Sequence, residues 1–161
     1  MPPMRAVVID PADPDRLVLK EVSSPSPTPG EALVRVAAFS LNLGEVRGAM
    51  SATVAARIGW DLAGTVEEAA ADGSGPPIGA RVVGRLPSGA WAEMVAVSTG
   101  DLAVLPDSVS FAEAATLPVA GLTALHAVER GSGLLARKVL VTGASGGVGL
   151  FACRLAQLSG A

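Results

Sequence analysis

The stretch Lys138-Val-Leu-Val-Thr-Gly-Ala-Ser-Gly-Gly-Val-Gly149 decides how the second half of the chain is interpreted. Its valine-rich start, Lys138–Thr142, predicts a short β-strand, and Gly147–Leu158 predicts an apolar helix. The small residues between them let the backbone come close to a ligand, and the free N–H groups at the helix start attract an anion. A strand, a glycine turn and a helix in this order are the context that a dinucleotide-binding fingerprint requires.

The glycine pattern itself is Ala144-x-Gly146-x-x-Gly149, with alanine where the first glycine of G-x-G-x-x-G usually stands. We expect Gly149 to let the helix pack closely on the strand. A tight strand–helix turn without any ligand is the alternative interpretation. A phosphate-binding P-loop is excluded, because no Gly-Lys-Ser/Thr follows at the required spacing.

The composition and charge of the chain exclude several classes of protein. The 161 residues suit one domain of ordinary size, and a net charge of −3 with a pI near 5.1 argues against a nucleic-acid binder. The longest uncharged runs, Ala114–Val128 and Val139–Cys153, contain proline or glycine and are shorter than the about 20 apolar residues of a membrane span. The start shows no signal-peptide core, and Cys153 is the only cysteine, which excludes an intrachain disulfide. These features predict a cytoplasmic globular protein.

The first hundred residues read as short strands separated by turns rich in proline and glycine, which is typical of a small barrel or sandwich. The expected strands are Arg5–Ile9, Leu17–Val22, Glu31–Phe39, Leu62–Val66, Ala80–Gly84 and Trp91–Val97.

The pattern becomes helical after Pro106. Ser110 and Glu113 have the spacing of a capping box, which predicts a helix over Ala112–Leu117 that Pro118 ends. A second helix is expected over Leu122–Glu129. Its apolar positions available for burial are Leu122, Leu125, Ala127 and Val128.

Several motifs occur in an order that resembles one family. They are Ser40-Leu-Asn42, Gly59-Trp-Asp-Leu-Ala-Gly-Thr65, Gly79-Ala-Arg-Val-Val83, Gly89-Ala-Trp-Ala-Glu93, Leu117-Pro-Val-Ala-Gly-Leu-Thr123 and Val141-Thr-Gly-Ala-Ser-Gly-Gly-Val-Gly149. Together they resemble the medium-chain dehydrogenases/reductases, in the zinc-independent quinone oxidoreductase branch. The resemblance implies a β-rich GroES-like barrel domain over residues 1–117, without its C-terminal return segment. The first β-α unit of a Rossmann domain would follow over residues 118–161.

The resemblance also implies a function and its residues. The expected reaction is hydride transfer from NADPH, with NADH as the alternative cofactor, to a quinone or an α,β-unsaturated carbonyl compound. Asn42 and Thr123 match positions near the nicotinamide, and Met50 and Trp60 match the substrate cleft. The cofactor loop would consist of Ala144, Ser145, Gly146, Gly147 and Val148. The full-length family members imply a homodimer.

No metal site is expected. Zinc-dependent relatives have cysteine at the position of Asn42 and Gly-His-Glu in place of Gly59-Trp60-Asp61, and neither an amide nor an indole is a zinc ligand. The chain contains no tyrosine, so the proton donor of the reaction stays unassigned and solvent is one candidate.

Two further alternatives accompany this interpretation. Family members are about twice as long, so the chain by itself is either part of an enzyme or a non-catalytic module with an incomplete cofactor site. Among single residues, His126, Cys153 and Trp91 are interpreted as structural, and Asp61 as a scaffold residue. Asp61 and Glu45 could form a carboxylate pair, but nothing in the sequence indicates that they meet.

Overall fold

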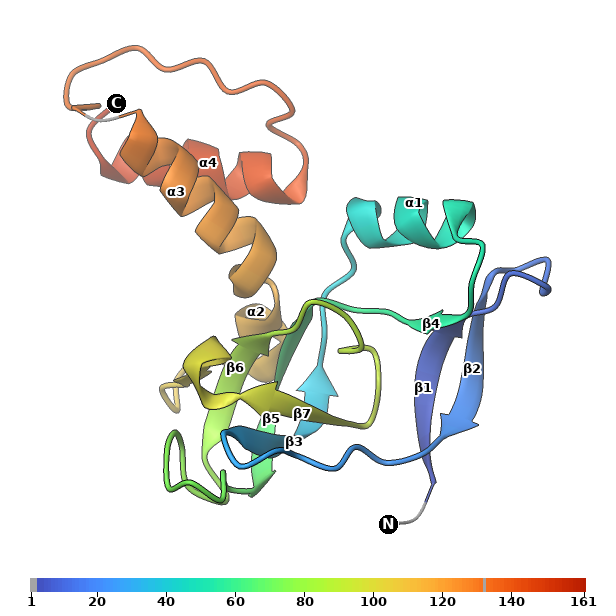
Figure 1. The fold of residues 1–161 in the computed structure, drawn as a ribbon. Helices are drawn as coiled ribbons and strands as arrows, with labels where there is room; N and C mark the ends of the chain where they lie inside the picture. The colour runs from blue at the N-terminus through green and yellow to red at the C-terminus, as the bar shows by residue number, and fades with distance from the viewer. Residues whose placement is uncertain (1–2, 132) are drawn as a thin grey trace. The chain divides into compact units, whose positions relative to one another are not determined.

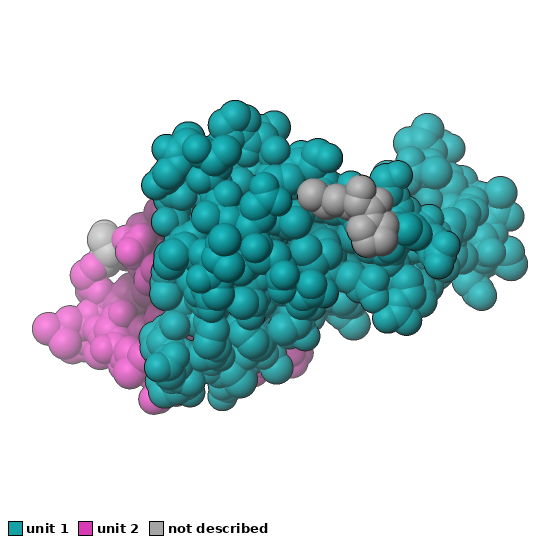
Figure 2. Space-filling view, turned by 90° about the horizontal axis from the view of Figure 1, so that it is seen from below, with its two compact units in different colours: residues 1–115 teal, residues 116–161 magenta. Residues whose placement is uncertain are grey.

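The structure is a computed structural model that describes residues 3–131 and 133–161 (Figure 1). It divides into two compact units, Met1–Ala115 and Thr116–Ala161, which Figure 2 distinguishes by colour. The assignment of residues 1–117 and 118–161 to a catalytic and a cofactor domain stays a prediction.

Two antiparallel sheets form most of the first unit. One has the strand order β2-β1-β4 and the other β7-β3-β5-β6-β8 (Figure 1). The strands are β1 (Met4–Ile9), β2 (Leu17–Val22), β3 (Glu31–Ala38), β4 (Ala56–Arg57), β5 (Asp61–Glu68), β6 (Arg81–Arg85), β7 (Met94–Ser98) and β8 (Leu102–Val104). The six strands expected from the sequence are therefore present, with small shifts at their ends, and β4 and β8 are additional.

The core of this unit is made of aliphatic side chains from the five-stranded sheet. The largest fully buried hydrophobic side chains are Leu62, Val34, Val66, Val82, Val95 and Val97. The sequence predicts a half-buried strand here from alternation, with Leu33, Arg35 and Ala37 on one face. Arg35 and Ala37 are indeed exposed while Val34 is buried, but Leu33 is buried as well, next to a register shift in the pairing of β3 with β5. The two sheets meet where the Val7 N–H donates to the carbonyl of Trp91 at 2.8 Å.

Helix α1 (Leu43–Ser51) follows β3 and was not predicted from the sequence. It contains Gly44 and Gly48, which are poor helix formers, so its intrinsic helix propensity is low. A start signal is nevertheless present, because Asn42 and Glu45 have the spacing of a helix N-cap and its third residue.

The predicted helix after Pro106 is confirmed as α2 (Phe111–Ala115), and its capping box is present. Glu113 accepts hydrogen bonds from the Ser110 backbone N–H at 3.0 Å and from its hydroxyl at 2.7 Å, and the Glu113 N–H donates to the hydroxyl at 3.2 Å. The expectation that Pro118 ends this helix is wrong. Pro118 lies at the start of the π-helical turn η2 (Leu117–Gly121), where its missing N–H leaves no helical hydrogen bond unmade.

Helices α3 (Leu122–Arg130) and α4 (Gly147–Leu158) complete the second unit, and both agree with the sequence pattern. The expected burial of Leu122 and Ala127 is wrong, since both are exposed. Only Ala124 of α3 is fully buried, because this helix packs mainly against α4 and η2.

The expected strand Lys138–Thr142 is also wrong, because the segment has no strand hydrogen bonds. A β-strand exists only through a ladder with a neighbour, and no strand lies beside this segment in the described part of the second unit. Val139 and Leu140 are 44% and 90% exposed as a result. Among the described residues, no helix has the length and apolarity to cross a membrane.

Gly64 provides a test of the sheet, because it lies in β5 between β3 and β6. A Cβ at this position would lie 2.0 Å from the carbonyl oxygen of Arg35, so Gly64→Ala forces the strands apart. We expect it to lower the free energy of unfolding by about 3 kcal/mol. Gly48→Ala is the matched control: the space around it is open, and alanine raises helix stability by up to about 1 kcal/mol. If Gly64→Ala and Gly48→Ala change the free energy of unfolding equally, as measured by chemical denaturation, this packing is contradicted.

Candidate functional site

A cluster of four polar residues lies where β3, α1 and β5 meet. It consists of Ser40, Asn42, Glu45 and Asp61, and we call it the Asp61 cluster. Asp61 is the first residue of β5 and is 0% exposed. Its Oδ2 accepts hydrogen bonds from the Ser40 hydroxyl and from the Asn42 side-chain amide, the latter at 2.8 Å. The sheet and the helix start thus bring together side chains about 20 residues apart in the chain.

Glu45 links the start of α1 to the loop before β5. Its carboxylate accepts the backbone N–H of Asn42 at 2.6 Å and that of Trp60 at 2.7 Å. Glu45 is 3% exposed, and this burial is the main reason that its pKa is raised above the ordinary value. The hydrogen bonds from Asn42 and Trp60 oppose this effect, and the charge of Asp61 adds to it, an influence that nothing in the sequence indicated.

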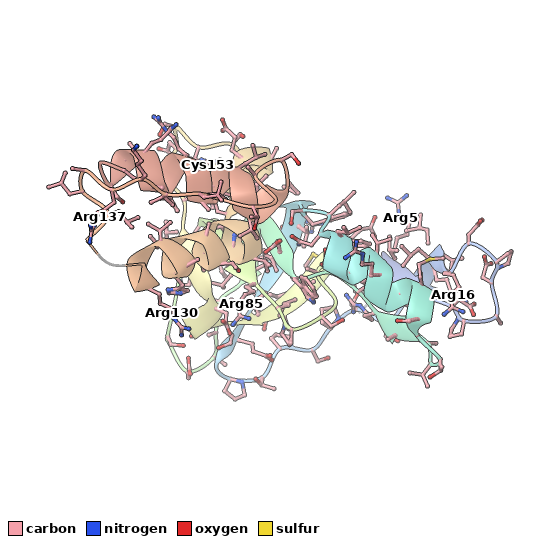
Figure 3. The ribbon with its side chains drawn as sticks, turned by 90° about the horizontal axis from the view of Figure 1, so that it is seen from above. Arg5, Arg16, Arg85, Arg130, Arg137 and Cys153 are labelled. Atoms are coloured by element: carbon pink, nitrogen blue, oxygen red, sulfur yellow. The ribbon has the colours of Figure 1, made fainter. Side chains whose placement is uncertain are left out.

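The structure places Trp60 against the start of α1. A Cβ added to Gly44 would lie 3.0 Å from a ring carbon of Trp60, so the indole packs on the first turn of α1. Met50 lies near the other end of the helix and is 58% exposed. There the Arg16 guanidinium donates to the carbonyls of Ala49 and Met50, at 3.3 and 3.1 Å, and satisfies the helix end (Figure 3).

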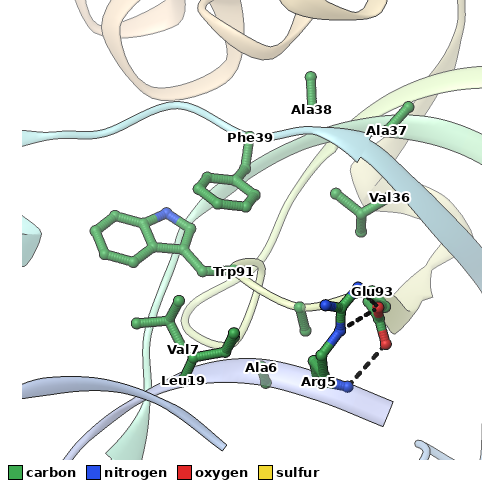
Figure 4. A pocket seen from close by; sticks show the side chains of 11 residues that line it. Arg5, Ala6, Val7, Leu19, Val36, Ala37, Ala38, Phe39, Trp91 and Glu93 are labelled. Carbon is green, nitrogen blue, oxygen red and sulfur yellow. Dashed lines mark hydrogen bonds and ion pairs between the residues drawn. The ribbon is translucent and has the colours of Figure 1, made fainter.

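An apolar hollow of about 450 Å³ lies between β1 and β3 (Figure 4). Phe39 and Trp91 form one wall, with their rings stacked at a centroid distance of 5.6 Å, and the ion pair of Arg5 and Glu93 lies at its rim. None of the predicted site residues lines this hollow. Trp91 links the wall of the hollow to the Asp61 cluster, because its indole N–H donates to the Ser40 carbonyl at 3.0 Å.

The glycine turn of the second unit leads directly into α4. Gly143 has a φ of +66°, and its carbonyl accepts the N–H of Gly146 at 3.0 Å. A Cβ at Gly149 would lie 2.1 Å from the Gly143 carbonyl oxygen, so glycine is required there because the helix packs on the turn. The prediction that Gly149 packs against a strand is therefore wrong, because Gly149 packs against the turn itself.

The first turn of α4 is exposed and has no side-chain cap. Gly146 is the N-cap, no side chain caps the helix, and its first turn contains no acidic residue. All of Ala144, Ser145, Gly146, Gly147 and Val148 are exposed. A hollow of about 550 Å³ lies beside the turn, lined mostly by apolar residues such as Val141 and Ala152. Thr123, in the first turn of α3, is exposed as well.

The remaining candidates have ordinary surroundings. His126 is on the exposed side of α3, with Nδ1 3.4 Å from a Glu129 carboxylate oxygen. Cys153 is half-buried on α4 (Figure 3). No group of three or more histidine, cysteine, aspartate or glutamate side chains in the described residues could hold a metal ion.

Residues 28–107 match the family described as Alcohol dehydrogenase GroES-like domain. The motif order and the similar proteins extend this match to the rest of the chain. The chain belongs to the medium-chain dehydrogenase/reductase family. Its fold is the GroES-like domain of this family, with helices at the C-terminal end of the chain.

Among three similar proteins, two are named as quinone oxidoreductases and indicate the branch. The chain is 38% identical to a chloroplast envelope quinone oxidoreductase homologue from Arabidopsis thaliana over 89% of its own length and 49% of that protein. The quinone oxidoreductase from Coxiella burnetii has a TM-score of 0.91 at 29% identity, covering 99% of this chain and 55% of that one. NorB, a spectinabilin polyketide synthase system protein from Streptomyces orinoci, is 38% identical over 83% of this chain and 6% of its own length. The chain thus spans about half the length of its quinone oxidoreductase relatives.

The sequence analysis missed the role of Ser40 and Glu45. Ser40 was part of a motif, but no contact was assigned to it. The only feature of the sequence that could have indicated its role is its position two residues before Asn42. Glu45 could have been found from its spacing to Asn42, which marks a helix start.

Glu45 generates a prediction about pH. Its raised pKa means that the folded state favours the protonated form, so its contribution to stability is present below the unfolded-state pKa of about 4.3 and is lost as the pH rises through the folded-state pKa. Glu45→Gln removes this titration. We therefore expect the stability of the unmodified protein relative to Glu45→Gln to fall as the pH rises above the unfolded-state pKa, measured by denaturant unfolding across a pH series.

Asp72→Asn is the matched control. Hydrogen bonds from Ser74 lower the pKa of the exposed Asp72, so its stabilising effect is present above its unfolded-state pKa and lost as the pH falls. The stability of the unmodified protein relative to Asp72→Asn is expected to rise with pH. If the stability of the unmodified protein relative to Glu45→Gln also rises with pH, the prediction is contradicted. The backbone N–H groups that bond to Glu45 would then outweigh the effect of its burial.

Proposed function

We propose that these residues belong to an oxidoreductase that transfers hydride from NADPH, or alternatively NADH, to a quinone or an α,β-unsaturated carbonyl compound. The observation that carries this proposal is the uncapped start of α4, which follows the glycine turn and has no acidic side chain in its first turn. Backbone N–H groups in this arrangement bind the pyrophosphate of a dinucleotide. The quinone oxidoreductase relatives support the choice of reaction.

The residues of the chain fit a nicotinamide cofactor. We propose that the exposed turn Ala144–Val148 holds the pyrophosphate, because it has no side chain large enough to block it. Asn42 and Thr123 would contact the nicotinamide end, and Trp60 and Met50 would line the substrate cleft. When bound, the cofactor supplies a hydride, which is two electrons and one proton, and one further proton completes the reduction of the acceptor. The cytoplasmic location and the homodimer remain part of this proposal.

A metal-free reaction is part of the proposal. The Asn42 amide is engaged with Asp61, and the indole of Trp60 packs on α1, so neither is available as a zinc ligand. The Asp61 carboxylate is fully buried and already accepts two hydrogen bonds. These residues orient ligands by hydrogen bonds and packing.

The polyketide synthase relative favours a second acceptor. An acyl chain carried by a synthase is a thioester, and an α,β-unsaturated thioester accepts hydride at its β-carbon as an enone does. The similarity to NorB therefore supports an unsaturated thioester as an alternative to a free quinone.

A turnover assay tests the reaction. We expect the natural protein that carries these residues to oxidise NADPH with a quinone or with an unsaturated thioester, before and after dialysis against a chelator. We expect the 161-residue chain alone to be oligomeric or poorly soluble and to show no turnover, because apolar residues such as Leu140 are exposed. A monomeric, active 161-residue chain would contradict the second expectation. Loss of activity with the chelator would contradict the metal-free site.

Val148→Asp tests the cofactor site. It places a carboxylate at the second position of α4, where it is favourable to the helix dipole but repels a pyrophosphate. We expect at least about a ten-fold weaker binding of NADPH, from a loss of about 1.4 kcal/mol or more. Val148→Asn, which has a similar size and no charge, should bind within about three-fold of the unmodified protein. Equal binding by both variants would exclude the start of α4 as the pyrophosphate site.

A further inference from the structure

We propose that Arg16 is a positioning residue that clamps the C-terminal end of α1 to the tip of the β1–β2 hairpin, so that the helix end and the hairpin tip move as one body. The inference rests on the proposed function, in which Met50 of α1 lines the substrate cleft. Arg16 would act on the acceptor only through the main chain that carries Met50.

Helix α1 has little stability of its own at its C-terminal end. It has nine residues, a length that is marginal for an isolated helix, and it contains Gly44 and Gly48. Its last turn has no basic residue, and Ala52 after it is extended, so no left-handed glycine closes the helix. The carbonyl groups at this end therefore need donors from elsewhere in the protein.

The donors come from one guanidinium that lies 33 to 36 residues away in the chain. Nη2 of Arg16 donates to the carbonyls of Ala49 and Met50 at 3.3 and 3.1 Å, and it also donates to the carbonyl of Ala52. Nη1 donates to the carbonyl of Pro11 at 3.2 Å, within the hairpin tip itself. One planar group with several fixed donors thus bonds the hairpin tip and the helix end together.

The backbone of Arg16 has an unusual conformation that accompanies this contact. Its φ is +64°, in the left-handed region that residues with a side chain rarely adopt. Its N–H donates to the Asp13 carbonyl at 3.1 Å, and its carbonyl accepts the Asp10 N–H at 2.8 Å. Such a conformation persists only where the surrounding contacts require it, and the bonds to α1 are contacts of this kind.

The guanidinium bonds the helix end although carboxylates are near in the chain. Asp13 and Asp15 belong to the same hairpin tip, but none of the ion pairs among the described residues involves Arg16. The negative end of the helix dipole stabilises its positive charge instead. The clamp is therefore specific to the end of α1.

Apolar packing joins the same two elements. Ile9 and Ala49 are buried in one cluster, and Leu17 packs against it. Ile9 and Leu17 are paired at the ends of β1 and β2, so the cluster spans the hairpin and the helix. The Met50 side chain, in contrast, is 58% exposed, while its carbonyl is held by Arg16. A fixed main chain that carries an exposed side chain is suited to contact with a ligand.

Hydrogen exchange of the natural protein that carries these residues tests the clamp with Arg16→Lys. Lysine keeps the charge and the cost of the positive φ, but it lacks the planar set of donors. We expect the amides of residues 47–52 to exchange at least about ten-fold faster, and those of β5 to change by less than about two-fold. Arg85→Lys is the matched control, because the Arg85 guanidinium is exposed and donates to Asp101 at 3.4 Å. It should leave the exchange of α1 unchanged.

Turnover kinetics with a quinone test the effect on the acceptor. We expect Arg16→Lys to raise the KM of the quinone at least about five-fold and to leave the KM of NADPH within about two-fold, because Met50 is displaced. Arg85→Lys should change neither KM. A merely structural role of Arg16 would lower the amount of folded enzyme and therefore the apparent kcat, without a change in one KM alone.

The outcomes separate this inference from the proposed function. Equal exchange of α1 in Arg16→Lys and Arg85→Lys overturns the clamp. Faster exchange that extends equally to β5 also overturns it, because it indicates a general loss of stability. Faster exchange of α1 with an unchanged KM of the quinone overturns the effect on the acceptor. Absence of turnover by the unmodified protein overturns the proposed function, whereas the exchange experiment still decides the clamp.

Discussion

The structure around the candidate site depends on how the buried carboxylate of Asp61 is satisfied. Asp61 is 0% exposed and begins β5, a strand enclosed between β3 and β6. A buried charge without partners is strongly destabilising, so its hydrogen bonds are a condition for the sheet to form as it does. Ser40 and Asn42 supply these bonds from the segment between β3 and α1. The hydrogen bonds that the Asp61 carboxylate requires therefore fix the positions of Ser40 and Asn42.

Glu45 adds a second buried carboxylate to the same region. Its two bonds to backbone N–H groups hold the start of α1 against the loop that contains Trp60. Burial and the charge of Asp61 oppose its ionisation, and they raise the pKa of Glu45. Two neighbouring carboxylates are a poor choice for stability alone, since apolar residues of similar volume are often as stable or more so. Their presence agrees with a role in orienting polar side chains for a ligand.

The sequence predicted those features whose causes are local or repetitive. Strand β3 was found from its alternation, and the capping box at Ser110 from its spacing, because each reflects neighbouring residues. The strand expected at Lys138–Thr142 failed because a strand depends on a partner that local pattern does not reveal. The link between Glu45 and Asp61, which both bond to Asn42, was missed for a related reason: only the tertiary fold brings residues this distant in the chain to one place. The glycine turn was correctly placed before α4, although Gly149 packs on the turn and not on a strand.

A crystal structure of the natural protein with oxidised NADP tests the central claim, that the start of α4 binds the pyrophosphate of a nicotinamide cofactor. The account predicts that the pyrophosphate oxygens accept N–H groups of the Gly146–Val148 turn. A pyrophosphate bound elsewhere would contradict the account.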